Sequence, residues 1–563
     1  QKAQVVIANP SGISCDGCGF INAGRTTLTT GSVQMQNGTI TGYQVDRGDI
    51  VIGGKGMDTT RQDHTDIIAR AVKVNAALHA NDLKVTTGRN RVDAAHEQTT
   101  VSADNGTDKP QFALDVSQVG GMYAGKIRLR GTEKGVGMRS AGHIGASAGE
   151  VRITADGMIE NSGAVSAKGN TVIATNASVN NSGSLWSSSD TDISATGHVQ
   201  NSGSVAASRH TRVQAASLTS TTTGTLASGI SSDGKTGNSG DLTLSAAGRL
   251  ETHGLNVAGG NISASGQGLD ASGSRTQAKN ITLDAKQQSL STAGAQVIAE
   301  SGLKASTAGT HNNNGGLLAG DTLSLSAKRL QNNSGQIVQS GTQALTLSHQ
   351  DGIENREGTI ATNARDLTLQ TAALDNRDGE IIHAGNGTLT MTSATFTGDR
   401  GSLASSGTLA LKGRDLVLDG STTTAKGIRI DADNLSNRGG QLVQSGNGTM
   451  ALDVRHSTDN RGGQIAANGS VALNTTDLDN RQGQILAADA GSLSVRATGQ
   501  TDSREGVLAA ASNVTVTTGQ LSNDSGLISA EKGQMVLTST GQLSNTGGQI
   551  AAAGEMTLTA GGL

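Results

Sequence analysis

Pairs of aliphatic residues separated by one polar position recur through the second half of the chain at near-constant intervals. This period-two alternation predicts short β-strands with one buried face, because successive side chains of a strand point to opposite sides. Each pair follows a glycine in the pattern Asn-x-x-Gly-x-(Ile/Leu), and these anchor glycines lie 19 to 23 residues apart. The anchor glycines are Gly316, Gly335, Gly358, Gly379, Gly401, Gly420, Gly440, Gly463, Gly483, Gly506, Gly526 and Gly548, with an earlier series at Gly163, Gly183, Gly203 and Gly224.

A third apolar residue stands five positions before most anchor glycines, with Thr458 and Thr501 as exceptions. Each repeat therefore supplies three short strands separated by Gly, Asn and Asp turns. Such a strand cannot bury its apolar side alone, but it can do so against the equivalent strand of the next repeat. The sequence predicts an all-β fold, a right-handed parallel β-helix (a solenoid) with about 21 residues per coil; the right hand is the default for parallel crossovers.

At a strand spacing of about 4.8 Å, roughly 27 such coils would give a rod about 130 Å long. A β-propeller or sandwich fits less well, because these folds need blades of about 40 residues or hairpins with aromatic anchors.

Composition favours a thin solenoid core. The 563 residues include 79 Gly, 2 Pro and about 1% aromatic residues. Proline would remove ladder hydrogen bonds, and a narrow interior accepts few rings. The net charge of −4, the absence of a Lys/Arg-rich run and the scarcity of stacking aromatics argue against nucleic acid as a partner. We expect no transmembrane segment, since no apolar run approaches the ~18 residues of a membrane span.

The pattern divides the chain into three parts. Residues 1–140 lack the anchor, residues 141–330 predict a less regular β-helix, and residues 331–563 predict the most regular shaft. The middle part includes an irregular Gly/Ser-rich stretch around Ser228 to Gly240.

Two further features concern the ends and one ambiguous segment. Asp66 to Asn81 can be read as an amphipathic helix or as strands, and both readings stay open from the pattern alone.

The chain opens without Met or a signal peptide and stops at Leu563 without a polar cap. We interpret it as an internal fragment and expect the native protein to continue past Leu563, because an uncapped coil exposes strand edges.

The cysteines, Cys15 and Cys18, form a C-x-x-C pair in "SCDGCGF". Such a pair is half a zinc site, a redox couple or a local disulfide. No second Cys/His pair lies nearby for zinc, and the glycine-rich context lacks the strand-to-helix setting of a redox motif. A structural turn disulfide is the preferred interpretation if the chain is exported.

A polar stripe accompanies the later repeats. Arginine stands two residues before several anchor glycines, an acid stands two residues before most of these arginines, and asparagine lies between them. Stacked coils would align these side chains in ladders, either as a cationic track for an anionic glycan or as a self-neutralised corner with asparagines hydrogen-bonded along the stack. The alternating acids favour the second interpretation. The stripe comprises Glu354, Asn355, Arg356, Asp375, Asn376, Arg377, Asn437, Arg438, Asp459, Asn460, Arg461, Asp479, Asn480, Arg481, Asp502 and Arg504.

No catalytic, cofactor-binding or metal-binding residue is predicted, and we expect no enzyme activity. The 11 histidines share no repeat position and form no metal-ligand spacing. A carbohydrate-active β-helix enzyme of the polysaccharide lyase type is the alternative function. It requires acids and bases clustered on one face, whereas the Asp-Asn-Arg motif recurs on coil after coil, as a structural motif does.

The N-terminal segment resembles a known family. "NPSGI" from Asn9 to Ile13, "GFINAGRTTLTTG" and "NDLKVTTGRN" are similar to the secretion domain of two-partner-secretion exoproteins, which include filamentous haemagglutinins and contact-dependent growth inhibition toxins. The "LDNRQGQI" repeats likewise resemble haemagglutinin repeats. The usual family motif is Asn-Pro-Asn-Gly-Ile, so Ser11 is a conservative departure, and the start of that domain is missing.

This resemblance implies that Asn9, Pro10, Gly12 and Ile13 belong to the secretion motif and that residues 1–140 are a β-helical remnant of the secretion domain, with Asp66 to Asn81 in strands. It also implies an Omp85-type outer-membrane transporter as partner and a secreted or cell-surface filament. The expected role is adhesion, presentation of a C-terminal toxin to neighbouring bacteria, or both, with a receptor on a neighbouring or host cell.

Overall fold

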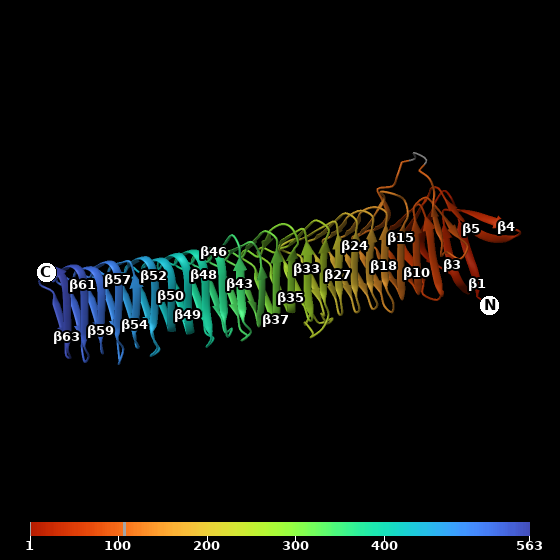
Figure 1. Ribbon diagram of the computed structural model, residues 1–563. Coiled ribbons are helices and arrows are strands. Elements are labelled where there is room, and N and C mark those ends of the chain that lie inside the picture. Colours follow the sequence, from red (N-terminus) through yellow and green to blue (C-terminus); the bar gives the residue numbers. More distant parts are fainter. Residues whose placement is uncertain (1, 105–107, 563) are drawn as a thin grey trace. The chain divides into compact units, whose positions relative to one another are not determined.

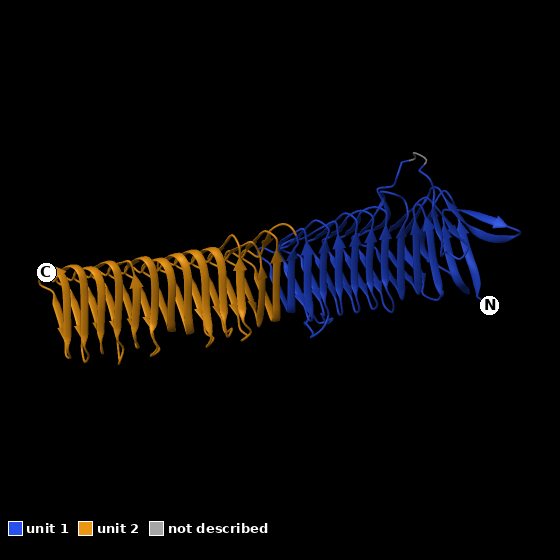
Figure 2. Ribbon diagram, in the orientation of Figure 1, with its two compact units in different colours: residues 1–286 blue, residues 287–563 orange. Residues whose placement is uncertain are grey.

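In the computed structural model, which describes residues 2–104 and 108–562, every regular element is a β-strand (Figure 1). The chain divides into two compact units, residues 1–286 and 287–563 (Figure 2). Within each unit, parallel strands of successive coils pair face by face. The predicted all-β parallel β-helix with about 21 residues per coil is confirmed.

Unit 1 repeats a three-strand coil, represented by β18 (Val151–Ala155), β19 (Ile159–Asn161) and β20 (Ala164–Ala167). These strands pair in parallel with β21 (Thr171–Thr175), β22 (Val179–Asn181) and β23 (Ser184–Ser187) of the next coil. Ile153, Ile159 and Val165 point inward and are buried, one from each face. The inward positions alternate with outward ones along these strands, as the period-two pattern requires.

Several coils of unit 2 join two of the three faces in longer, bent strands. β52 (Met450–Asp459) and β57 (Leu493–Asp502) carry both the aliphatic pair and the third apolar position, and β53 (Gln464–Ala467) forms the remaining face. Met450 and Leu452 pair with Val471 and Leu473 in the next coil, and all four are buried. The aliphatic pairs of the sequence pattern therefore form the core.

Threonine replaces the third apolar residue without leaving the interior. Thr458 and Thr501 are both 1% exposed. Their hydroxyls donate to Thr475 Oγ1 at 3.3 Å and to Thr518 Oγ1 at 3.1 Å. An inward-facing threonine is tolerated because its hydroxyl finds a buried partner.

Buried asparagines form a hydrogen-bonded ladder along unit 2. Nδ2 of Asn437 donates to Oδ1 of Asn460, and Nδ2 of Asn460 donates to Oδ1 of Asn480, each at 2.7 Å. Nδ2 of Asn480 donates to the Ser503 hydroxyl at 3.2 Å. The same link joins Asn313, Asn332, Asn355 and Asn376 in sequence, and Asn161, Asn181 and Asn201 in unit 1. The sequence pattern predicted such bonds at a self-neutralised corner for five of these residues, but the structure buries all five inside the coil: Asn355, Asn376, Asn437, Asn460 and Asn480.

One anchor glycine was misplaced by the sequence analysis. The backbone N–H of Ser421 donates to Leu418 O, as Gly440 N–H donates to Asn437 O, so Ser421 is the equivalent of the anchor glycines. Gly420 instead occupies the preceding turn position with φ +62°, which other coils fill with residues such as Gln482 at φ +57°. The sequence pattern chose the wrong residue because a glycine suits either place in this turn.

Asp66 to Asn81 is extended, as the family resemblance implied. β7 (His64–Ala69), β8 (Ala71–Val74) and β9 (Ala77–Ala80) supply one strand to each face of a coil. The irregular stretch forms an exposed loop between β29 (Thr225–Ser228) and β30 (Leu242–Ala246), with one antiparallel bridge between Ile230 and Thr236.

Candidate functional site

The predicted motif residues form a tight turn between β1 (Ala3–Ala8) and β2 (Ile13–Gly19). The backbone N–H of Gly12 donates to Asn9 O at 3.0 Å, and the Ser11 N–H donates to Asn9 Oδ1 at 3.1 Å. The Asn9 side chain thus mimics a backbone turn, which Asn and Asp favour. Asn9 is exposed, whereas Pro10 is half-buried. Asn9, Pro10 and Gly12 therefore lie together in the turn, and Ile13 begins the strand that follows.

Two glycines allow this turn to stack on the next coil. Gly12 has φ +121°, and a Cβ there would lie 3.0 Å from Asp49 O. Gly48 of the next coil has φ +89°, and a Cβ there would lie 2.7 Å from Pro10 O. Both positions combine a left-handed backbone with a close backbone neighbour, so a larger residue would separate the coils.

Cys15 and Cys18 lie in a bulge at the far end of β2. Their Sγ atoms are 2.05 Å apart and their Cα atoms 5.6 Å apart. β2 pairs with β6 (Asp49–Thr59), and the register shifts between Asp16 and Cys18. Asp16 Oδ1 accepts the Lys55 N–H at 2.7 Å, inside the glycine-rich bend of β6. The "CDGC" and "GGKG" segments are therefore matched bulges in stacked strands.

A four-stranded antiparallel sheet projects beside these coils, and the sequence analysis missed it (Figure 1). Its strands, in spatial order, are β12 (Thr99–Val101), β11 (Asn90–Asp93), β5 (Thr39–Val45) and β4 (Ser32–Gln36). Asn37 and Gly38 join β4 to β5 with φ of +50° and +75°. The Asn-Gly dipeptide between alternating apolar residues was the available signal, because it favours a two-residue hairpin turn.

The antiparallel sheet is attached to the coils by a buried ion cluster around Asp66 in β7, which is 2% exposed. Arg25 Nε donates to Asp66 Oδ2 at 2.8 Å, and His96 Nδ1 lies 3.0 Å from Asp66 Oδ1. His96 has φ +62° and lies between β11 and β12, with its ring edge-on to Tyr43 at 5.2 Å. Lys84 donates to the His96 carbonyl.

The basic partners keep the Asp66 carboxyl ionised. Burial alone would raise the pKa of the Asp66 carboxyl, but hydrogen bonds and charge attraction from His96 and Arg25 outweigh burial and lower that pKa. Burial raises the pKa of the Tyr43 hydroxyl. The cluster therefore holds a buried carboxylate as an ionised link between two elements, and no feature of the motif residues themselves revealed it.

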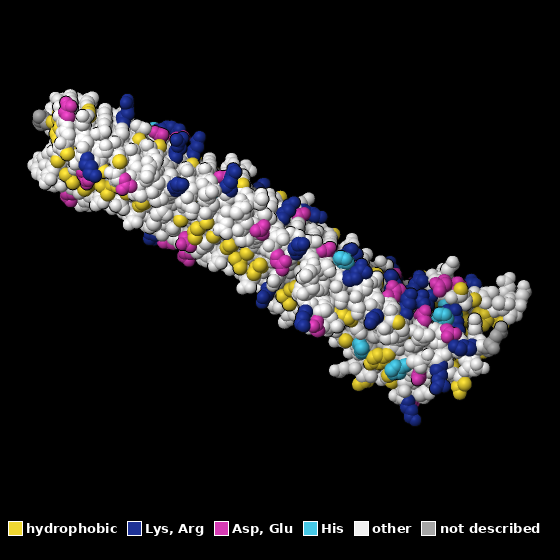
Figure 3. Space-filling view, turned by 90° about the horizontal axis from the view of Figure 1, so that it is seen from below, with side chains coloured by type: hydrophobic (Ala, Val, Ile, Leu, Met, Phe, Trp, Pro, Cys, Tyr) yellow, Lys and Arg dark blue, Asp and Glu magenta, His cyan; other side chains and the backbone are white. Residues whose placement is uncertain are grey.

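The polar stripe of unit 2 is self-neutralised. Arg461, Arg481 and Arg504 each reach the acid two residues earlier, Asp459, Asp479 and Asp502, with N–O distances of 2.6 Å. The hydrogen bonds that these arginines donate to the carboxylates raise the pKa of the arginines. Acidic and basic side chains are interspersed on the face in Figure 3. An uninterrupted cationic track is therefore not formed by these pairs, in agreement with the second of the two interpretations.

Across residues 2–104 and 108–562, no group of three or more His, Cys, Asp or Glu side chains is placed to hold a metal ion. Within the same residues, no helix is long and apolar enough to cross a membrane.

Comparison with known proteins gives two family matches. The TPS secretion domain matches residues 1–161. The haemagglutinin repeat matches residues 146–203, 278–357, 351–413, 387–449, 443–490 and 490–563, which is more than half of the chain.

The chain is similar to several individual proteins. The chain is 40% identical over 523 residues to a protein named Toxin CdiA from Yersinia pestis, covering 84% of this chain and 16% of that protein. It is 48% identical over 326 residues to tRNA nuclease CdiA-2 from Burkholderia pseudomallei strain 1026b, covering 57% of this chain and 10% of that protein. The crystal structure of a filamentous haemagglutinin secretion domain is similar at 26% identity with a TM-score of 0.27, covering 36% of this chain and 61% of that chain. The chain thus spans only a small part of the length of the curated relatives it matches.

Proposed function

The chain belongs to the two-partner-secretion exoproteins with haemagglutinin-repeat shafts, and from this premise we propose that it is the exported, cell-surface shaft of a contact-dependent growth inhibition protein. The shaft presents a C-terminal toxin to neighbouring bacteria and contributes to adhesion. The observation that carries this proposal is the 40% identity over 84% of the chain to a protein named Toxin CdiA. The carbohydrate-active enzyme is not favoured, because the recurring Asp and Arg groups of the stripe neutralise one another.

Secretion is proposed to begin with the N-terminal coils. The turn of Asn9, Pro10 and Gly12 and the strand begun by Ile13 form the part that an Omp85-type transporter recognises. Each coil contacts only its neighbours, so coils can add one at a time as the chain emerges, and folding outside the cell biases movement outward. A receptor on the target cell and the nuclease named in the relatives are proposed for the whole protein.

The secretion proposal is tested in cells that carry the matching transporter. The intact protein and a version lacking residues 1–140 are compared by protease accessibility of the shaft on whole cells. A third version, Ser494→Ala, changes an exposed hydroxyl far from the motif and serves as the control. Loss of surface shaft only in the truncated version supports the proposal, and normal export of that version refutes it.

The Cys15–Cys18 disulfide is proposed as a local clamp on the bulge that joins β2 to β6. Because it closes a very short loop, its effect on stability is small, about 2 kcal/mol in the chain-entropy treatment. Alkylation of the secreted protein without reductant, followed by peptide mass measurement, tests it. Two alkylated cysteines in the untreated protein would contradict the disulfide.

A further inference from the structure

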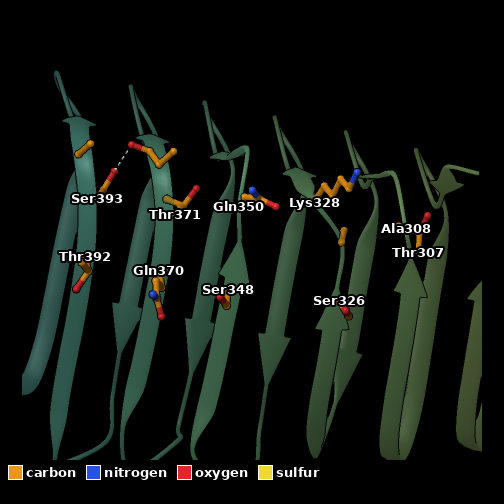
Figure 4. A pocket seen from close by; sticks show the side chains of 13 residues that line it. Thr307, Ala308, Ser326, Lys328, Ser348, Gln350, Gln370, Thr371, Thr392 and Ser393 are labelled. Atoms are coloured by element: carbon orange, nitrogen blue, oxygen red, sulfur yellow. Dashed lines mark hydrogen bonds between the residues drawn. The ribbon is translucent and has the colours of Figure 1, made fainter.

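A concave groove on unit 2 lies apart from the motif turn, the ion cluster and the polar stripe described above. It crosses five successive coils and has a volume of about 620 Å³. Its lining is mostly hydroxyl, amide and methyl groups, with Lys328 as the charged member. The lining residues are Thr307, Ala308, Ser326, Ala327, Lys328, Ser348, Gln350, Gln370, Thr371, Ala372, Thr392, Ser393 and Ala394. Figure 4 shows these side chains in rows across neighbouring strands.

Two hydroxyl groups on the floor of the groove already donate hydrogen bonds to protein carbonyls. Ser393 Oγ donates to the carbonyls of Ala372 at 3.3 Å and Thr395 at 2.6 Å, the former contact lying within the groove of Figure 4. The Thr371 hydroxyl donates to Ala373 O at 3.3 Å. These bonds lie at the bend between two faces of the coil.

The walls carry polar groups that the protein leaves available. Ser326, Ser348, Gln350, Gln370 and Thr392 are exposed, and within the described part of the chain their side chains make no hydrogen bond to protein. Hydroxyls and amides both donate and accept hydrogen bonds. The walls therefore offer a row of neutral groups that suits a ligand rich in hydroxyls.

The same outward column changes character beyond the groove. Gln370 and Thr392 are followed in register by Lys412, Asp431, Asp453 and Asn474. There Asn474 Nδ2 donates to Asp453 at 2.7 Å, and Asp431 pairs with Arg455 at 3.3 Å. In this column, Asp431, Asp453 and Asn474 beyond the groove have protein partners. Within the described residues, the side chains of Gln370 and Thr392 inside the groove have none.

We propose that this groove binds a neutral oligosaccharide, with about one pyranose ring per coil. The rungs repeat at about 4.8 Å, a length comparable to one ring of an extended glycan, so successive hydroxyls and amides meet successive sugars. The ligand lies along the shaft and is bound without cleavage, since no lining residue is an acid or histidine able to act in glycoside hydrolysis.

Other chain-like ligands fit less well. An extended peptide binds a sheet mainly through free backbone groups at an edge, but the strands that form the groove are already paired on both sides, as β46 (Leu367–Asp375) is with β43 (Leu345–His349) and β48 (Thr388–Thr397). A nucleic acid or acidic glycan requires several cations, and Lys328 is alone in the lining.

The test measures binding of cellotetraose, maltotetraose and tetra-N-acetylchitotetraose to the 563-residue chain by calorimetric titration, with the corresponding disaccharides and tetragalacturonate alongside. We expect at least one neutral tetrasaccharide to bind, at least fivefold more tightly than its disaccharide. The double variant Gln350→Ala/Gln370→Ala should weaken binding at least tenfold, because each neutral hydrogen bond is worth roughly a factor of five.

The matched control is Gln520→Ala/Gln542→Ala, which removes two exposed glutamines from coils outside the groove. Its binding should stay within twofold of the unmodified chain. Circular dichroism checks that both double variants keep their strand content. Any of three results would overturn the proposal. None of the three neutral tetrasaccharides binds at millimolar concentration, tetragalacturonate binds more tightly than they do, or the control pair loses as much affinity as the groove pair.

Discussion

Removing one amide from the buried asparagine ladder should loosen the shaft locally. Asn460 is fully buried, and its Nδ2 donates to Asn480 Oδ1 at 2.7 Å and to the Gly463 and Gln484 carbonyls at 3.2 Å each. Its Oδ1 accepts the Nδ2 group of Asn437 at 2.7 Å. Asn460→Ala therefore breaks the ladder on both sides at once.

The magnitude follows from what is left unpaired. Asn480 Oδ1 loses the donor that satisfies it inside the coil, and an unsatisfied buried polar group costs about 1–3 kcal/mol. The weakened bonds of Asn437 and of the two carbonyls add to this cost. We expect a total of about 3 kcal/mol, which corresponds to roughly a hundredfold increase in the population of the locally open coil.

Hydrogen exchange measured by mass spectrometry reads this opening directly, because each coil contacts only its neighbours and opens locally. Amides of residues 460–487 should exchange about a hundredfold faster in Asn460→Ala. The exchange rate of Asn460→Ser should fall between those of the unmodified chain and Asn460→Ala. The reason is that Ser503, at the equivalent place in a later coil, still accepts a hydrogen bond from the Asn480 amide at 3.2 Å. The control Asn468→Ala removes an exposed amide that donates to Ser445 O at 2.9 Å and should change exchange by less than about threefold. Equal exchange in the two alanine variants would refute the ladder's role.

Three further predictions concern single sites. Gly12→Ala should destabilise the first coils by about 1–3 kcal/mol, since φ is +121° and the new Cβ lies 3.0 Å from Asp49 O; proteolysis near residue 12 no faster than in the unmodified chain would contradict this. The pKa of Asp66 is lowered in the folded protein, so its stabilising contribution is present above about pH 4 and is lost as pH falls through the folded value. Protection of the backbone amides of residues 90–101 against hydrogen exchange should therefore fall in acid. Asp66→Asn should abolish this pH dependence of protection. The same pH dependence in the variant would argue against a role for Asp66. His311 is fully buried, and burial lowers its pKa to about 3. Below about pH 6.5 this histidine takes up a proton only when the chain unfolds. The first coils of unit 2 should therefore lose roughly 2 kcal/mol of unfolding free energy between pH 7.5 and pH 5. His311→Leu, which copies the Leu330 that pairs with it in the next coil, should remove this loss in exchange corrected for intrinsic rates, and persistence of the loss would assign it elsewhere.

The coils were predictable because their pattern repeats. Leu452 pairs with Leu473 and Ile465 with Ile485, at spacings within the 19 to 23 residues that separate the anchor glycines. A repeat fixes strand register, since a one-residue slip would turn the apolar set to solvent. The exception, Ser421 in place of Gly420, arose where glycine and serine are adjacent and the turn accepts either arrangement.

The candidate site was predictable only in part. The turn at Asn9 follows from local chemistry, because an Asn-Pro pair and a glycine specify their own geometry. The antiparallel sheet did not follow, although the Asn37-Gly38 hairpin signal was present. Its attachment depends on Asp66 meeting His96, and no repeat relates those two positions.

The sequence by itself determined the period, the strand faces and the aliphatic core, because each coil is a copy whose nearest contacts are its own repeats. Only the tertiary structure decided which polar groups are buried, which pair with one another and which remain available. Asn460 and Gln370 are both amide side chains in repeats, yet one lies inside the coil and the other faces the open groove. The reason is physical: whether an amide is satisfied depends on the atoms that stacking brings within hydrogen-bond distance, and residue type alone does not specify them.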